Sequence, residues 1–447
     1  MVRLAVPVVV VQVGLMLMGV VDTVMVGHLS KEALAAVTLG NIYVFSTAVI
    51  GMGVLMVIDP VVAQAVGAGD EPAIARGVQR GLLLAVLLSI PGVLFLLPGE
   101  VVLGALRQPA DVVPLAAQYT RATLPGFLPF LAFIVFRQTL QAMNRLAAIV
   151  WIVVAGNLVN VALNYAFIYG HFGAPALGVV GSGWATAVGR TVLGAGILVL
   201  AWRDLRPTLI PFRREVLEWA PLLRMLRVGA PIAVTMSLEY GAFAVVGVMM
   251  GWLGTTQMAG HQVALNLASL TFMVPLGVSG AGAVLVGQAI GRGDPDGMRR
   301  AAGAALILGV GFMAGTAVLF LLLPGPLAAL YTGDPGVYAL AASLIPIAGL
   351  FQVFDGTQAV TVGILRGAGD TSAPMIINVL GFWLVGIPVS RWFGFGLGWG
   401  PVGLWWGFVA GLAAVALFLV LRLRTRFRRT VERLVIDRRH SAELPVA

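Results

Sequence analysis

The chain has 447 residues, of which 59% are hydrophobic and only 11% are charged, against roughly 45–50% and about 25% in an ordinary soluble domain. This composition excludes a soluble globular protein and indicates an integral membrane protein. The lack of cysteine excludes disulfides, zinc thiolate sites and cysteine nucleophiles. The apolar runs are continuous rather than alternating, which favours membrane helices over a strand barrel.

Runs of about 20 mainly apolar residues, the length that crosses a bilayer core of about 30 Å, recur along the whole chain. The first run lacks a small-residue cleavage site, so we expect it to be a retained helix rather than a signal peptide. The second and eighth runs contain Gly and Pro, and we expect both to be bent. The predicted spans are 4–27, 39–66, 80–98, 115–138, 146–170, 178–201, 228–252, 258–289, 301–324, 338–365, 373–393 and 400–421.

Basic residues fall almost entirely on one side of these spans. With the N-terminus placed in the cytoplasm, 23 of the 28 Lys and Arg residues are cytoplasmic, as the positive-inside rule expects. The net charge of +9 is thus explained by topology, and nucleic acid is not expected as a partner. We predict a multi-pass protein of the inner or plasma membrane of the cell, with both termini cytoplasmic.

The two halves of the chain repeat each other at an offset of 224 residues. Pro7 matches Pro231, Gly53 matches Gly277, and "VVGSGWATAVG" (179–189) aligns with "PVGLWWGFVAG" (401–411). Six spans per half is an even number, so the repeat is parallel, about an axis along the membrane normal. We predict an all-α integral membrane protein with 12 transmembrane helices in two six-helix bundles, related by a parallel pseudo-two-fold repeat and separated by a cleft. Its predicted parts are an N-terminal bundle (1–201), an Arg-rich cytoplasmic linker (202–227), a C-terminal bundle (228–421) and a basic cytoplasmic tail (422–447).

Familiar catalytic motifs do not occur in the sequence. A P-loop needs a lysine after its glycines, and the only lysine is Lys31. The four histidines, one of them His440 in the tail, form no HExxH motif. We therefore expect no enzyme and no cofactor, and a transporter becomes the main hypothesis, because duplicated bundles most often serve alternating access.

Acidic residues inside spans favour a functional role, because inserting Asp at the centre of a membrane helix costs about 2.5–3.5 kcal/mol of free energy. Asp355 lies near the middle of the tenth span, with Gln352 and Gln358 on the same helical face. Such a stripe offers oxygen ligands to a hard cation, or a carboxyl that holds a proton. The alternative is a carboxyl paired with a buried arginine or capped by glutamine. Glu239 lies near the centre of the seventh span and is a second candidate.

The N-terminal half has its own polar set. Asp22 lies towards the outer end of the first span, and Asn157, Asn160 and Asn164 recur on one face of the fifth span. The three amides could bond Asp22, a ligand or neighbouring backbone. Arg190, inside the sixth span, could neutralise a carboxylate or reach a carbonyl.

Asp59 is the fourth acid inside a span, and its neighbour Pro60 favours a local role at a kink. None of these four acids recurs at the repeat offset, which favours a functional role, since residues needed for the fold would be repeated. The repeat mates of the four acids are Val246 for Asp22, Leu15 for Glu239, Ala283 for Asp59 and Leu131 for Asp355.

Over nearly its whole length the chain resembles the MATE (multidrug and toxic compound extrusion) family, and its NorM-like branch in particular. The motifs that carry the resemblance are "MGVVDTVMVGHLS", "DPVVAQAVGAGD", "LNYAFIYGHFGAPALGVVGSGWATA", "MAGHQVALNLASLTFMVPLGVSGAG" and "GILRGAGDTSAP". The resemblance implies secondary active efflux of organic, often cationic and lipophilic, drugs in antiport with Na+ or H+. It departs at Asn164, where another branch has an aspartate.

The resemblance assigns coupling of the cation or proton to Asp22, Glu239 and Asp355, with Glu239 and Asp355 as ligands if the ion is Na+. Drug binding is predicted at Asp22, Asn160, Asn164, Gln352, Gln358 and Asp355. Central coupling is expected at Glu239 and Asp355, whereas Asp22 could serve release or gating. A monomer in contact with membrane lipid is expected. The alternative function is a flippase for lipid-linked precursors or oligosaccharides on the same architecture, and a channel or membrane enzyme is a further class.

Overall fold

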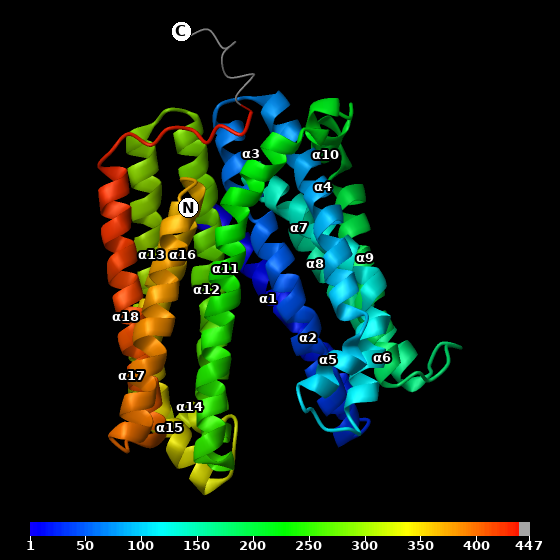
Figure 1. The fold of residues 1–447 in the computed structure, drawn as a ribbon, viewed down its shortest axis with the longest axis vertical. Coiled ribbons are helices and arrows are strands. Elements are labelled where there is room, and N and C mark those ends of the chain that lie inside the picture. Colours follow the sequence, from blue (N-terminus) through cyan, green and yellow to red (C-terminus); the bar gives the residue numbers. More distant parts are fainter. Residues whose placement is uncertain (438–447) are drawn as a thin grey trace. The chain divides into compact units, whose positions relative to one another are not determined.

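The computed structural model describes residues 1–437, and the last part of the predicted tail, with His440, lies outside the described residues. Every regular element in residues 1–437 is a helix. Twelve helical segments are long and apolar enough to cross a membrane, so the twelve predicted spans are confirmed (Figure 1).

The chain divides into two compact units. Unit 1 contains residues 1–9 and 234–434, and unit 2 contains residues 10–233 and 435–447. The division falls after Val9 in α1 and after Ala233 in α11, two positions that match at the repeat offset of 224. The domain boundaries predicted from the sequence stay a prediction.

Unit 2 contains the first six spans, packed around α9. Helices α6, α7 and α8 all pack on α9. The bounds are α1 (Val2–Gly27), α2 (Lys31–Leu55), α3 (Ile58–Gly67), α4 (Glu71–Leu96), α5 (Gly99–Ala105), α6 (Val113–Thr123), η1 (Leu124–Gly126), α7 (Phe127–Ala142), α8 (Ala147–Tyr169), α9 (Val179–Leu200), α10 (Trp202–Leu209), η2 (Arg214–Leu217) and the beginning of α11 (Trp219–Leu253).

Unit 1 contains the remaining spans, packed around α15. Helices α12, α13 and α18 all pack on α15. After α11, the bounds are α12 (Thr255–Gly291), α13 (Pro295–Leu322), α14 (Pro324–Ala329), α15 (Pro335–Gly367), α16 (Ser372–Val379), η3 (Leu380–Gly386), α17 (Ile387–Arg391), η4 (Trp392–Gly396) and α18 (Gly400–Phe427).

The second span is interrupted between α2 and α3, just before Asp59 and Pro60. The eighth span is one continuous helix that runs through Pro275, and the bend expected there stays a prediction. The eleventh span contains two π-helical stretches, η3 and η4, which the sequence analysis did not foresee.

Glycines on α18 explain how that irregular eleventh span packs. Gly403, Gly407 and Gly411 recur every fourth residue, and a Cβ at these positions would lie 2.6, 2.2 and 2.4 Å from backbone atoms of Phe393, Ser390 and Gly386. Small residues at this spacing let two membrane helices approach closely. The four-residue spacing of these glycines in the sequence could have predicted this close contact between helices.

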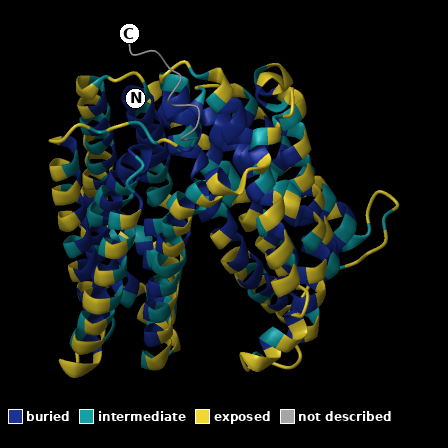
Figure 2. Cartoon of the chain, turned by 45° about the horizontal axis from the view of Figure 1, so that its top comes forward, coloured by how far each residue is buried: buried dark blue, intermediate teal, exposed yellow. Residues whose placement is uncertain are grey.

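Apolar side chains cover the outside of each bundle. Helix α1 is strongly apolar, with a mean hydropathy of 2.5 over its most apolar 18 residues. Its exposed apolar side chains include Val6, Val10, Leu17, Val20 and Val24. Figure 2 shows buried residues towards the interior of each bundle and exposed ones on its outer side. An apolar outer face fits contact with lipid rather than water.

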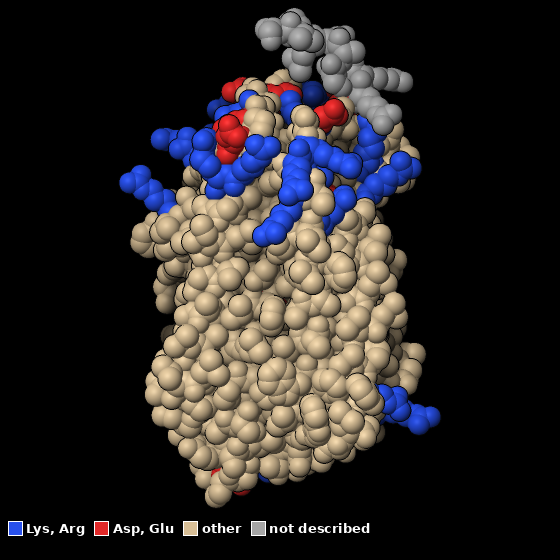
Figure 3. Space-filling model, turned by 90° about the vertical axis from the view of Figure 1, so that its left-hand side faces the viewer, with Lys and Arg blue, Asp and Glu red and all other residues tan. Residues whose placement is uncertain are grey.

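Basic side chains gather at one end of the helices, which we call the arginine-rich end. On the face drawn in Figure 3, Lys and Arg crowd this end, and the long middle of the surface is almost free of charge. In unit 1 this end includes Arg292, Arg299, Arg300, Arg422, Arg424, Arg426, Arg428 and Arg429.

Four turns, two in each unit, share one backbone design. Gly69, Asn144, Gly293 and Gly369 all have a positive φ, between 59° and 74°. In each turn the next N–H donates to the carbonyl five residues back, at 2.8 to 3.0 Å, which closes the preceding helix. Two of these four turns have the matching sequences "GAGD" (67–70) and "GRGD" (291–294), which lie at the repeat offset.

Ion pairs hold two of the turns, with reversed polarity. Arg145, after Asn144, pairs with Asp204 at 3.4 Å in unit 2, whereas Asp370, after Gly369, pairs with Arg422 at 2.8 Å in unit 1. These two turns therefore share a backbone design but not the order of their charges.

The described segment after α18, residues 428–437, contacts unit 2 near its end. In unit 2, the Asp437 carboxylate pairs with Arg76 and Arg80 of α4, each at 2.8 Å, and the carbonyl of Ile436 accepts a hydrogen bond from Arg224. The predicted tail thus begins as the last turns of α18 and continues as an extended segment.

The positive φ at Gly293 gives the first prediction. A side chain there would meet no atom within 4 Å, so Gly293→Ala should destabilise the protein through backbone strain alone, by about 1–2 kcal/mol. Denaturant unfolding in detergent micelles measures the change.

Gly303 is the matched control, because it also has open space around it but lies inside α13. Gly303→Ala should stabilise by about 0.5–1 kcal/mol. Equal effects of the two substitutions would contradict this account of the turn.

Candidate functional site

The polar residues predicted to act form one cluster in each unit. In unit 1 the cluster lies on α11 and α15, and in unit 2 it lies on α1, α8 and α9. We call them the Glu239–Asp355 cluster and the Asp22 cluster.

Aromatic packing positions the carboxyl groups of unit 1. Phe243 and Phe351 pack edge to face with centroids 5.9 Å apart, and Phe408 of α18 contacts both, at 4.8 and 5.4 Å. Such aromatic pairs each contribute about 0.5–1.5 kcal/mol beyond burial. Glu239 precedes Phe243 by one turn and Asp355 follows Phe351 by one turn, so the antiparallel helices bring the two acids to one level.

The two acids of unit 1 lie close enough for their charges to interact. Asp355 is 5% exposed, and its Oδ1 accepts no hydrogen bond from any residue in 1–437. Nε2 of Gln358 donates to Glu239 Oε2 at 3.2 Å and to Asn378 Oδ1 at 2.8 Å. This cluster therefore contains two neighbouring acids, of which one presents an unused oxygen.

A further oxygen of the Glu239–Asp355 cluster is also unused. Gln358 Oε1 is buried and makes no hydrogen bond with the described residues. An unpaired buried acceptor is costly unless something satisfies it. Together with the carboxylates it forms an oxygen-rich environment that suits a proton or a hard cation such as Na+.

Gln352 is engaged differently from Asp355 and Gln358. Its Oε1 accepts from Thr271 at 2.6 Å and its Nε2 donates to Thr316 at 2.9 Å, and the side chain is fully buried. Gln352 thus ties α15 to α12 and α13. Thr271 and Thr316 were not predicted as partners of Gln352.

In unit 2, Asp22 is saturated with hydrogen bonds. Asn160 and Asn164 donate to Oδ1 at 3.1 and 2.6 Å, and Thr186 donates to Oδ2 at 2.9 Å. Asp22 itself is 3% exposed. Of the alternatives left open for the asparagines, these two bond the carboxylate.

Asn157, the third asparagine of the stripe, bonds backbone instead. Its Nδ2 donates to the carbonyls of Gly14 and Val153 at 2.9 and 2.8 Å. Thr186 was not predicted as a site residue. The signal in the sequence was a polar face on the sixth span, because Ser182 and Thr186 are four residues apart and lie on one side of the helix.

Arg190 and Asp59 complete the predicted polar residues. Arg190 lies one turn beyond Thr186, with its guanidinium 5.0 Å from the ring centre of Phe130. Asp59 is fully buried in the first turn of α3 and belongs to neither cluster.

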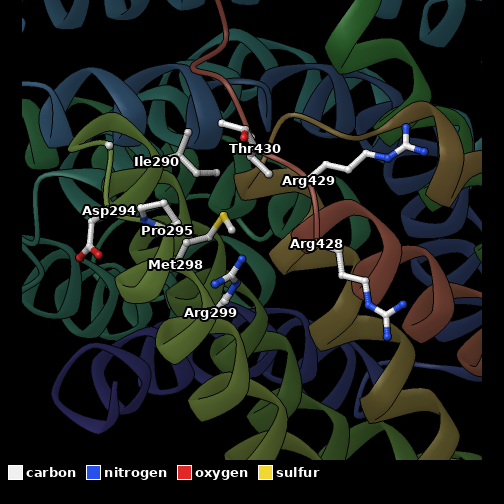
Figure 4. A pocket seen from close by; sticks show the side chains of 10 residues that line it. Ile290, Asp294, Pro295, Met298, Arg299, Arg428, Arg429 and Thr430 are labelled. Carbon is white, nitrogen blue, oxygen red and sulfur yellow. The ribbon is translucent and has the colours of Figure 1, made fainter.

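A cavity of about 230 Å³ lies elsewhere, at the arginine-rich end of unit 1. Figure 4 shows Met298 and Arg299 on one side and Arg428 and Arg429 on the other, with the last two guanidinium groups pointing away from Met298. None of the predicted site residues lines it. Within residues 1–437, no three His, Asp or Glu side chains converge as a metal-binding group.

The hydrogen bond from Thr186 to Asp22 yields a prediction. Thr186→Val keeps the shape but removes a donor from a buried carboxylate, which should cost about 1–3 kcal/mol. Thermal unfolding of the purified protein in detergent measures the loss.

Thr191→Val on the same helix is the control, since its hydroxyl bonds only the Ala187 carbonyl of its own helix, and it should change stability by less than about 0.5 kcal/mol. If both variants lost the same stability, Thr186 would have no special role at Asp22.

Comparison with known proteins identifies the family. The MatE family model matches residues 7–166 and 231–392, one segment in each repeat. The "Probable multidrug resistance protein NorM" of Bradyrhizobium diazoefficiens is 38% identical over 96% of this chain and 93% of its own. "Multidrug resistance protein MdtK" of Edwardsiella ictaluri is 35% identical over 87% of this chain and 85% of its own.

Solved structures share the fold. The chain superposes on the eukaryotic MATE transporter AtDTX14 with a TM-score of 0.86, at 20% identity over 94% of both chains. It superposes on an outward-facing multidrug resistance MATE family transporter of the MOP superfamily with a TM-score of 0.87, at 20% identity over 96% of this chain and 95% of the other. The predicted all-α architecture is therefore confirmed. The chain is a multi-pass membrane protein and belongs to the MatE family.

Proposed function

We propose that the protein is a secondary active multidrug efflux transporter, which exports organic and often cationic compounds in antiport with Na+ or H+. The observation that carries the proposal is the unused carboxylate oxygen of Asp355 beside Glu239 in a buried, oxygen-rich cluster. Family membership supports it, and so do the printed names of the relatives, which are multidrug resistance proteins.

The mechanism is competition for one negative charge. An organic cation binds to the carboxylate of Asp355 from the inner side, with Met and Phe side chains supplying adaptable apolar contact. On the outer side, Na+ or H+ takes the same carboxylate and the drug leaves. Because one site cannot hold both cations at once, the inward ion gradient drives export.

We assign central coupling to Glu239 and Asp355, with both as ligands if the ion is Na+. Gln358 contributes its unused Oε1 and is proposed to contact the drug together with Asp355. Drug contacts at Asp22, Asn160, Asn164 and Gln352 and coupling at Asp22 stay predictions, because these side chains make their hydrogen bonds within the protein.

We further propose that the arginine-rich end is cytoplasmic and that the protein acts as a lipid-embedded monomer in the inner or plasma membrane, needing no cofactor and catalysing no chemical reaction. The positive-inside rule supports the orientation. A flippase for lipid-linked precursors is the less favoured alternative, because the curated relatives carry multidrug resistance names.

The test is ethidium efflux from proteoliposomes under an imposed Na+ gradient and, separately, an imposed pH gradient. Asp355→Asn keeps the size of the side chain but removes the charge, so gradient-driven efflux should fall at least tenfold while expression and folding persist. The gradient that drives the wild type identifies the coupling ion.

Asp296→Asn serves as the control, since this carboxylate is exposed at the beginning of α13 and its loss should leave efflux unchanged. Full gradient-driven efflux by the Asp355→Asn variant would refute the assignment.

A further inference from the structure

The irregular eleventh span contacts both helices that carry Glu239 and Asp355. Its first part, α16, is followed directly by the π-helical stretch η3. Asn378, in the last turn of α16, contacts α15, and Trp383, in η3, contacts α11. Because π-helical turns are rare and occur frequently at functional sites, the role of these two side chains is of interest.

Asn378 orients Gln358 of α15. Its Oδ1 accepts a hydrogen bond from Gln358 Nε2 at 2.8 Å, and the same Nε2 donates to Glu239 Oε2 at 3.2 Å. The Nδ2 of Asn378 donates to the Pro374 carbonyl of its own helix at 2.8 Å, and the side chain is buried. Asn378 is therefore fixed at both ends of its amide and holds Gln358 where that residue meets Glu239.

Trp383 contacts α11 directly beside Glu239. Its indole Nε1 donates to the carbonyl of Leu238, the residue before Glu239, at 3.1 Å. The ring also packs against Gly241, two residues after Glu239, where a Cβ would lie 3.3 Å from Cζ2 of the indole. This is closer than an ordinary van der Waals contact, so the ring approaches α11 as it does because residue 241 has no side chain. One half-buried indole thus contacts the backbone on both sides of Glu239.

The π-helical geometry explains how one span makes both contacts. Asn378 and Trp383 are five residues apart, and in a regular α-helix such side chains point about 140° apart around the axis. The hydrogen bonds of a π-helix join residues five apart, as the N–H of Ile387 shows by donating to the carbonyl of Phe382. This geometry turns Trp383 back toward the side of Asn378, so that one contacts α11 and the other α15.

The repeat shows that this irregularity is not a general feature of the scaffold. The corresponding span of unit 2, the fifth, is the single α-helix α8, whereas the eleventh contains η3 and η4. The π-helical stretch η3 therefore occurs in the unit with two neighbouring acids, and it brings Trp383 to the helix that carries one of them.

We propose that Trp383 is a positioning residue for the coupling ion. Its two contacts with α11 hold Glu239 in the place beside Asp355 that the ion requires. In this scheme the indole acts through the backbone of α11 and does not bind the ion itself. The inference deepens the proposed function and rests on it, because it takes Glu239 and Asp355 as the coupling pair.

Trp383→Phe tests the indole N–H, since it keeps an aromatic ring and removes the donor. Ethidium, at a concentration equal to its Kd for each variant, is displaced from the purified protein by Na+ at fixed pH and, separately, by H+ without Na+. For the ion that displaces it from the wild type, the concentration needed for half displacement should rise at least fivefold, because a loosely held Glu239 binds the ion less tightly. Displacement should still be complete at saturating ion. A merely structural role would lower the melting temperature and leave this midpoint unchanged in the folded protein.

Gly241→Ala tests the same contact from the side of α11. The added methyl group would lie 3.3 Å from Cζ2 of Trp383, so the indole has to shift and the midpoint should rise at least twofold. A phenyl ring is smaller than indole and leaves room for the methyl group, so adding Gly241→Ala to Trp383→Phe should cause no further rise. Strictly additive shifts would mean that the glycine acts independently of the indole, and would overturn the proposal.

Trp392→Phe is the matched control. Trp392 lies in η4, the second π-helical stretch of the same span, and is 59% exposed, so its replacement should leave the midpoint unchanged. A rise equal to that of Trp383→Phe would contradict a specific role for Trp383.

Two outcomes separate this inference from the proposed function. If neither Na+ nor H+ displaces ethidium from the wild type, the proposed function fails and the inference fails with it. If one of them does so, and acts at the same concentration on the Trp383→Phe variant, the inference alone fails.

Discussion

A buried charge inside a membrane-spanning bundle must be compensated, and this constraint organises both units. Insertion of an uncompensated Asp costs about 2.5–3.5 kcal/mol even on the lenient insertion scales. In unit 2 the structure meets the cost with three hydrogen bonds to Asp22. In unit 1 the cost at Asp355 is left partly unmet, and this deficit is what a transported cation or a proton can fill.

The rest of the fold holds these charges in place. The aromatic contacts among Phe243, Phe351 and Phe408 set the level at which Glu239 and Asp355 meet. Gln352 ties α15 to its neighbours through two threonines. The central helix of each unit carries a charged residue within its membrane span: α15 carries Asp355, and α9 carries Arg190.

The repeat explains how one scaffold supports two kinds of interior. Backbone features recur faithfully, as the turns at Gly69 and Gly293 show. Asp70 and Asp294 also recur and cap the helices that follow these turns, whereas the ion pairs Arg145–Asp204 and Asp370–Arg422 have opposite polarity. The two units therefore share helices and turns but differ in the acidic residues inside their membrane spans.

Much of this could be predicted from the sequence, because hydropathy, loop charge and the 224-residue offset are properties of the chain alone. The spans, the Asn stripe facing Asp22 and the polar face of α15 belong to this class. The π-helical stretches at 380–386 and 392–396 were not predicted. The backbone of this span packs closely against glycines of α18, and such tertiary packing is not visible in the local sequence.

Nor could the roles of neighbouring polar residues be separated in advance. Gln352 and Gln358 occupy equivalent spacings from Asp355, and only their tertiary partners distinguish a helix tie from a group with an unused oxygen.

The central claim is that a drug cation and the coupling ion compete for the carboxylate of Asp355. Ethidium affinity of the purified wild-type protein, measured across a range of Na+ concentration at fixed pH and a range of pH without Na+, tests it most directly. We expect the affinity to fall as the coupling ion rises, since Na+ or H+ neutralises the charge that ethidium needs. An affinity that is indifferent to both ions would contradict the claim.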